Sequence, residues 1–183
     1  MDARRTLLAD SALRIIGEEG IRALTHHRID DTAGLSRGST SYYCRRRVDF
    51  LRLALERLYE LDAADVATAA ASVQGGTSPS SLRRAVAELV ASWLSGEARV
   101  RSIARIELFM AASHEPELQP LVAEQLAGIG RAGLPFARGR GDTGVQRLAA
   151  GLMLMDGLML AVLREGRPAP SVDDIAALLE VLG

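Results

Sequence analysis

Apolar residues recur at helical spacing along nearly the whole chain, and this periodicity is the feature that most restricts its fold. Near the N-terminus, Leu8, Ala12, Ile15 and Ile16 occupy positions i, i+4, i+7 and i+8 of one helix face. No stretch of five or more residues combines alternating polarity with the β-branched enrichment of strands. The pattern therefore predicts an all-α protein.

Local start and stop signals divide the first half of the chain. Gly20 ends the first helix, Thr25 is a good N-cap for the second, and Gly34 closes the second. A short polar helix is predicted over 37–43, and a long amphipathic helix follows it and ends at the Gly, Ser and Pro-rich linker 72–81. We expect an N-terminal domain of three helices over 1–47 and a second domain over 48–183.

The second domain is predicted to be helical throughout. The apolar periodicity indicates helices at about 80–95, 98–113, 116–130, 145–165 and 171–182. Pro116 fits the first turn of the third of these helices. The Gly and Arg-rich stretch 131–144 is expected to be a loop.

Composition excludes several classes of protein. A single cysteine forms neither an intramolecular disulfide nor a cysteine zinc site, and the three histidines have no accompanying ligand spacing. We find no nucleophile–base pair, phosphate loop or metal set, so we expect no catalytic residue, no metal, no cofactor and no enzyme activity.

Membrane association is also not expected. Charges are spread through the N-terminal segment, which is therefore not a signal peptide. The most apolar run, 148–163, contains Asp156 and is shorter than the ~20 residues of a bilayer span, so it is predicted to be a buried helix. We expect a cytoplasmic protein.

The region 25–43 has the spacing of a helix-turn-helix, with Gly34, Leu35 and Ser36 as the turn. Its predicted second helix, 37–43, carries small and polar side chains that suit the DNA major groove. Net charge agrees: residues 1–59 hold 11 Arg and 8 acidic residues, whereas 60–183 hold 11 Arg and 15 acidic residues. The whole chain has a net charge of -1, so the basic character is local.

The stretch LTHHRIDDTAGLSRGSTSYYCRRRVDFLRLAL resembles the DNA-binding region of the TetR family of bacterial one-component transcriptional regulators, over about residues 5–58. The stretch ARIELFMAASHEPEL, 104–118, is similar to one found in many members. The resemblance implies a ligand-responsive repressor that binds a palindromic operator in double-stranded DNA as a homodimer. Our alternative from the residues is an all-α carrier or protein-interaction module without DNA binding.

Carried over by position, the resemblance implies that Thr25 caps the second helix beside the DNA backbone, that residues 37–43 enter the groove and that Arg47 binds phosphate. The candidate DNA-binding residues are Thr25, His26, His27, Arg37, Gly38, Ser39, Thr40, Ser41, Tyr42, Tyr43 and Arg47. The alternatives are a solvated first turn for the two histidines, inward packing for one tyrosine and a solvated charge run for Arg45 to Arg47.

The chain departs from the family pattern at three positions. Thr40 stands where a large aliphatic residue is usual, Ser41 where tyrosine is common, and Cys44 where phenylalanine usually packs. We interpret Cys44 as a small buried hydrophobe rather than a redox sensor, and expect Phe50 to fill the volume that it leaves.

The second domain offers candidates for a small-molecule pocket and for a dimer interface. The pocket candidates are Trp93, Phe109, Met110, Met153 and Asp156, for each of which core packing is the alternative. The interface candidates in the last two helices are Leu148, Leu152, Met155, Met159, Ile175, Leu178, Leu179 and Leu182. Asp156 could also bond at the dimer interface or be exposed.

Overall fold

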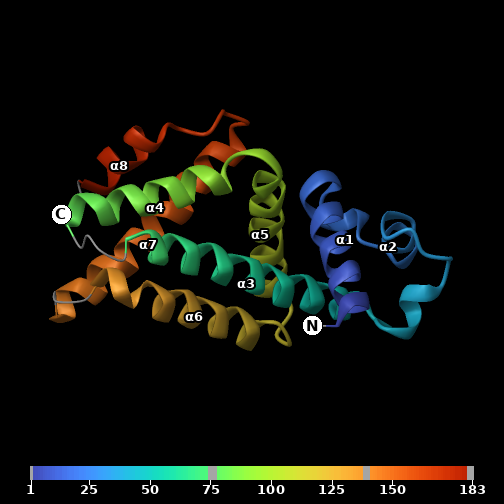
Figure 1. The fold of residues 1–183 in the computed structure, drawn as a ribbon. Helices are drawn as coiled ribbons and strands as arrows, with labels where there is room; N and C mark the ends of the chain where they lie inside the picture. The colour runs from blue at the N-terminus through green and yellow to red at the C-terminus, as the bar shows by residue number, and fades with distance from the viewer. Residues whose placement is uncertain (1, 74–77, 138–140, 181–183) are drawn as a thin grey trace. The chain divides into compact units, whose positions relative to one another are not determined.

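The computed structural model describes residues 2–73, 78–137 and 141–180, and within them every regular element is helical (Figure 1). The α-helices are α1 (Ala3–Glu19), α2 (His26–Thr32), α3 (Arg47–Ser72), α4 (Pro79–Trp93), α5 (Gly96–His114), α6 (Gln119–Ala137), α7 (Gly141–Arg164) and α8 (Val172–Glu180). Two 3₁₀ helices, η1 (Ile21–Ala23) and η2 (Ser39–Tyr42), lie in the N-terminal region. The all-α prediction is confirmed.

The chain packs as two compact units. Unit 1 comprises Met1–Leu61 and Val100–Gln125, and unit 2 comprises Asp62–Arg99 and Leu126–Gly183. Helices α3, α5 and α6 each contribute residues to both units. These units are defined by packing and not by function. They therefore do not test the predicted boundary between two functional domains after residue 47, which stays a prediction.

The core of unit 1 joins the N-terminal helices to α3 and α5. Leu8 and Ile16 of α1, Ile29 of α2 and Phe50 of α3 are buried in one apolar cluster, which also includes Leu108 of α5. Burying side chains of this size contributes roughly 1.5–3 kcal/mol each. The three N-terminal helices are therefore not an isolated layer, because α5 completes their core.

Helices α1 and α2 begin and end where the sequence predicts, whereas η1 was not predicted. Gly20 has φ +86° and its N–H bonds to the carbonyl of Ile16, which ends α1. The hydroxyl of Thr25 accepts from the N–H of Arg28 and caps α2, as expected. Gly34 follows α2 at φ +66°, a value that strains residues with a Cβ.

Unit 2 has its own core, in which α4 and α7 supply most of the buried side chains. Helix α8 packs along α4 (Figure 1), and Ile175 of α8 is fully buried. Ser171 and Asp174 form a reciprocal capping box at the start of α8, with the Ser171 hydroxyl accepting from the Asp174 N–H at 3.1 Å. The cap fixes where this last helix begins.

Two predictions about α6 and α7 were wrong. Pro116 lies in a turn rather than in a first helical turn, since α6 begins at Gln119 and Pro120 takes the early helical position instead. The expected loop 131–144 is helical over 131–137 and 141–144, and 138–140 lie outside the described residues. The Gly and Pro content of this stretch led to the error. Glycine lowers helix stability by only about 1 kcal/mol relative to alanine, and Gly141 and Gly144 lie in the first turn of α7, while Pro135 lies in the last turn of α6.

Across residues 2–73, 78–137 and 141–180, none of the helices combines the length and apolarity that a membrane crossing requires.

Helix α5 approaches α1 so closely that only glycine fits at position 17. A Cβ there would overlap the carbonyl oxygen and the side chain of Val100. We therefore expect Gly17→Ala to lower the free energy of unfolding by about 1–3 kcal/mol, as overpacking typically does. Urea unfolding at fixed protein concentration measures this change.

The matched control is Gly128→Ala, which places the same methyl group inside α6. Among the described side chains, the new Cβ would meet only the end of Arg131, at 3.8 Å. Because alanine favours a helix, we expect up to about 1 kcal/mol of stabilisation. Equal effects of the two substitutions would contradict the close approach at Gly17.

Candidate nucleic-acid interface

A buried carboxylate holds the segment that the sequence predicts to enter DNA. Asp30 of α2 is fully buried, and its two oxygens accept from the backbone N–H groups of Gly38 at 2.7 Å and Thr40 at 3.0 Å. The two amide hydrogen bonds replace those that the carboxylate would make to water if it were exposed. These two bonds tie the recognition segment, defined here as residues 37–43, to α2.

The recognition segment differs from the predicted helix over 37–43. Gly38 is left-handed, with φ +89°, and only Ser39–Tyr42 form a helical turn, of the 3₁₀ type. A left-handed residue cannot lie within a right-handed helix, so the helix starts two residues later than expected. The consequence is a compact turn whose shape depends on Gly38 and on the bonds from Asp30.

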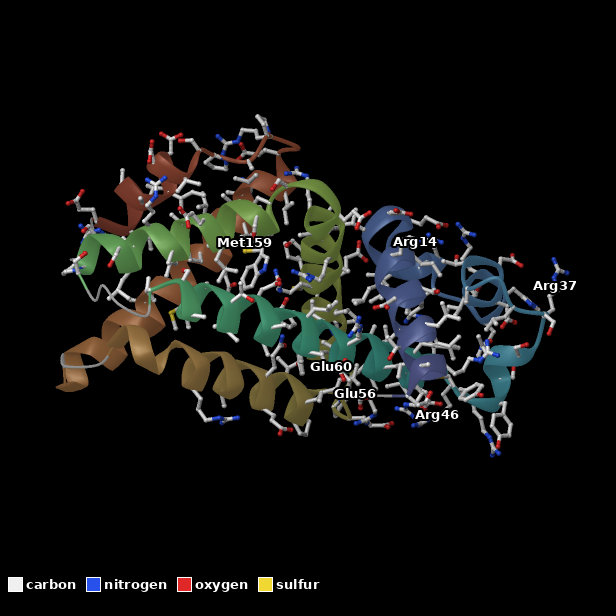
Figure 2. All side chains as sticks on the ribbon, viewed as in Figure 1. Arg14, Arg37, Arg46, Glu56, Glu60 and Met159 are labelled. Carbon is white, nitrogen blue, oxygen red and sulfur yellow. The ribbon has the colours of Figure 1, made fainter. Side chains whose placement is uncertain are left out.

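Most of the recognition segment is accessible. Arg37, Gly38, Ser41, Tyr42 and Tyr43 are exposed, with 85% of Tyr42 accessible. Figure 2 shows the Arg37 side chain pointing away from the ribbon.

The two tyrosine rings meet edge to face, with 5.2 Å between their centroids. Neither is buried, although inward packing of one was our alternative. Tyr42 and Tyr43 are large, exposed side chains that pack against one another, and such a surface can contact bases or phosphates.

Two residues predicted to contact DNA are partly or wholly internal. Thr40 is fully buried, and its hydroxyl lies 3.4 Å from the carbonyl of His26. The Nε2 atom of His26 lies 2.9 Å from the carbonyl oxygen of Cys44. The imidazole ring of His26 packs edge-on against the ring of Phe50, with 4.8 Å between the ring centroids. Both side chains join α2 to the end of the recognition segment, so we leave them out of the interface proposed below.

The remaining predicted positions at α2 and η2 are more open. Thr25 and His27 are exposed in the first turn of α2, and Ser39 is half-buried with its hydroxyl 3.0 Å from that of Ser36. Thr25 is the N-cap of α2. It is also exposed, so a DNA backbone could lie beside it.

The three arginines that follow have different environments. Arg46 forms two hydrogen bonds to the carboxylate of Glu117, at 3.0 and 3.1 Å, and this ion pair lowers the pKa of Glu117. Arg47, the predicted phosphate ligand, donates to the carbonyl of Ile21 at 2.8 Å while remaining exposed. The side chain of Arg45 is exposed as well. All three arginines are exposed, but the guanidinium of Arg46 is ion-paired with Glu117, so Arg45 and Arg47 are the better candidates for DNA contact.

A second carboxylate fixes the start of α3. Asp49 accepts from the backbone N–H groups of Arg46 at 2.8 Å and Arg45 at 2.9 Å, and these amide bonds lower its pKa. An acidic side chain that bonds back to the amides ahead of its own helix is half of a capping box. It sets the direction in which α3 leaves the recognition segment.

Cys44 matches the interpretation as a small buried hydrophobe. It is 4% exposed and lies in the same core cluster as Phe50, which is also buried, as expected. Burial raises the pKa of the Cys44 thiol to about 11, so the reactive thiolate is scarce at neutral pH.

The predicted pocket residues divide between the two units. Trp93 is buried in the core of unit 2, and its indole N–H donates to Asp65 at 2.8 Å. Phe109 packs against the core of unit 1 and Met110, also in unit 1, is 61% exposed. Met153 and Asp156 of α7 are both exposed.

Several predicted interface residues are buried within the chain itself. Met155, Met159 and Ile175 belong to the core of unit 2, while Leu178 is 42% exposed and Leu179 half-buried. Helix α7 is apolar on several faces, so the periodicity did not show which face turns inward. Leu182 and the side chains of Leu148 and Leu152 lie outside the described residues.

Sequence reasoning missed Asp30, Asp49 and Asp65, whose carboxylates fix backbone or indole N–H groups. For Asp30 a signal existed, because it lies next to Ile29 and three residues before Ala33, at the edge of the predicted inner face of α2. A carboxylate there needs a hydrogen-bonding partner. The Gly38 and Thr40 amides could not be identified as its partners without the shape of the turn.

An all-helical chain with an N-terminal helix-turn-helix and a C-terminal helical domain is the architecture of a one-component regulator. The family model described as "Tetracyclin repressor-like, C-terminal domain" matches residues 77–182. The chain belongs to the TetR family of transcriptional regulators. No curated protein matches the sequence significantly.

Solved structures agree with this assignment. A TetR family member from Streptomyces coelicolor A3, SCO1917, is 27% identical, with 99% of this chain and 98% of that chain covered and a TM-score of 0.79. The multidrug binding protein EbrR complexed with ethidium is also 27% identical, with the same shares covered and a TM-score of 0.73.

We expect Asp30→Ala to weaken the fold and DNA binding together, because it leaves two backbone amides without their acceptor. An unsatisfied buried donor typically costs about 1–3 kcal/mol, and the Gly38 N–H is only partly buried whereas the Thr40 N–H is buried, so the free energy of unfolding should fall by about 2–4 kcal/mol. Urea unfolding measures the change. The control is Asp31→Ala at the exposed neighbouring position, expected to stay within about 0.5 kcal/mol. Similar losses in both variants would contradict the role of Asp30.

Proposed function

We propose that the chain is a sequence-specific DNA-binding repressor that a small molecule releases from its operator. The observation that carries the proposal is the recognition segment, an exposed polar turn fixed from below by the buried carboxylate of Asp30. A preorganised turn loses little conformational entropy on binding.

The proposed DNA contacts are a revised set. Arg37, Ser41 and Tyr42 are the candidates for base edges, since Arg donates to guanine acceptors and hydroxyls both donate and accept. Thr25, His27, Gly38, Tyr43, Arg45 and Arg47 are candidates for the phosphate backbone. Ser39 is half-buried and is a weaker candidate.

One short turn contacts only a few base pairs, so we propose a homodimer on a palindromic operator. Met153, Gly157 and Leu160 are exposed at positions i, i+4 and i+7 of α7, and therefore share one face. With Leu178 of α8 they provide apolar surface for a second copy of the chain. Membership of the TetR family supports this choice of partner.

The DNA proposal predicts an operator that can be selected from random duplexes by the purified protein. Wild type should bind the selected duplex about 10³-fold or more tightly than a scrambled one in fluorescence anisotropy. Arg37→Ala and Tyr42→Ala should each cost about 1–3 kcal/mol per protomer on the selected duplex. Arg45→Ala should weaken binding to both duplexes alike and, because a dimer loses two phosphate contacts, reduce the salt slope by about two.

The control for these variants is Arg167→Ala, which removes an exposed arginine of unit 2. It should bind the selected duplex as wild type does. Equal, salt-sensitive binding of wild type to selected and scrambled duplexes would refute the repressor proposal and favour a carrier or interaction module.

The dimer proposal predicts that Met153→Glu dissociates the protein. A charge on a buried apolar interface loses its hydration, so we expect the dimer dissociation constant to rise at least about 30-fold. Sedimentation velocity over a concentration series measures it. Met110→Glu is the matched control, an exposed methionine on α5 outside the proposed interface. An unchanged dimer in the Met153 variant would exclude this face.

For the effector we propose an aromatic cation bound in unit 2 beside Trp93 and Asp65. A carboxylate next to an indole offers both charge and a π face to a cation, and the ethidium complex of EbrR supports this class. Ethidium is therefore the first probe. Its fluorescence should rise on binding, Asp65→Asn should weaken binding about tenfold, and saturating ethidium should lower operator affinity.

The control for the effector test is Asp173→Asn, at an exposed carboxylate of α8. Its ethidium affinity should equal that of wild type. If ethidium leaves wild-type fluorescence and operator affinity unchanged, the proposed effector class is wrong.

A further inference from the structure

The short helix η1 is fixed from two sides at a single residue. The backbone N–H of Ile21 donates to the carboxylate of Glu107 at 2.6 Å, and the carbonyl of Ile21 accepts from the Arg47 guanidinium at 2.8 Å. Glu107 lies on α5 and Arg47 begins α3, so these bonds come from different elements. Hydrogen bonds to charged groups are stronger than those between neutral groups. The position of Ile21 is therefore determined by α5 and α3 together.

Glu107 is one of two contacts that α5 makes on the same stretch of chain. Val100 approaches the backbone of Gly17 at the end of α1, and Glu107 is seven residues further along α5. Positions i and i+7 share a helix face. One face of α5 thus contacts both the last turn of α1 and the first residue of η1.

The contact at Ile21 continues into the recognition segment. Helix η1 ends three residues before the first residue of α2, which is capped by Thr25. Asp30 then connects α2 to Gly38 and Thr40. The series consists of two helices of fewer than eight residues, the two residues between them and the hydrogen bonds at either end, so the path from α5 to the recognition segment is short.

From these contacts we propose that Glu107 is a positioning residue, which acts through Ile21 to hold the recognition segment in the orientation that a specific operator requires. The inference rests on the proposed DNA-binding function. It assigns Glu107 no contact with DNA. Its role is to set the geometry of residues that do make contact.

The test uses the full-length protein with the selected and the scrambled duplex. Glu107→Ala should weaken binding to the selected duplex by about tenfold, as expected from the loss of one charge-assisted hydrogen bond, while binding to the scrambled duplex stays within about twofold. Non-specific binding depends on charge rather than on orientation, so only a positioning role separates the two affinities. Amide exchange at Ile21, followed by NMR, should accelerate at least about tenfold.

Two further variants complete the test. Glu107→Gln retains an oxygen that accepts the Ile21 N–H, so its affinity for the selected duplex should fall only about threefold. This variant also tests the inference if Glu107→Ala does not fold. Glu97→Ala removes an exposed carboxylate from the first turn of α5 and should bind both duplexes like wild type.

Glu107 variants that keep wild-type operator affinity, or that lose affinity for both duplexes equally, would overturn the inference. A wild type that does not discriminate between the duplexes would instead refute the proposed DNA-binding function. The two failures are therefore distinguishable.

Discussion

The structure of the N-terminal region depends on the carboxylate of Asp30. Burying an ionised carboxylate is costly unless hydrogen bonds replace its hydration, and here the amides of Gly38 and Thr40 do so. Because those amides belong to a left-handed glycine and to a buried threonine, the turn and the charge stabilise one another. The accessible side chains of the recognition segment are held in place by bonds made beneath them.

The sequence allowed the all-α class, the ends of α1 and α2 and the position of the helix-turn-helix to be predicted. These features depend on local signals, such as the Thr25 cap and Gly34 after α2, which act over one or two turns. The form of the recognition segment could not be predicted in this way. Its 3₁₀ geometry depends on a bond between residues eight positions apart, which periodicity does not reveal.

Predictions were weakest where apolar side chains surround a helix. In α7, Met155 and Met159 are buried whereas Met153 is exposed, although all three are suitable core residues. A helix with apolar residues on most faces lacks the polar stripe that identifies the solvent side. Helix α2 was easier to interpret because its polar residues left a single inner face, and the exception on that face, Asp30, has a specific bonding task.

The recognition segment contains positions that its backbone geometry restricts and positions that are free to vary. A side chain in place of Gly38, at φ +89°, is strained, and Thr40 fills a closed space, so neither position tolerates much variety. Arg37, Ser41 and Tyr42 alternate with them and are exposed. A library that randomises only these three positions would therefore retain the turn while sampling new base preferences. The DNA sequence that such a protein prefers could then be changed by substituting these three side chains while the backbone stays the same.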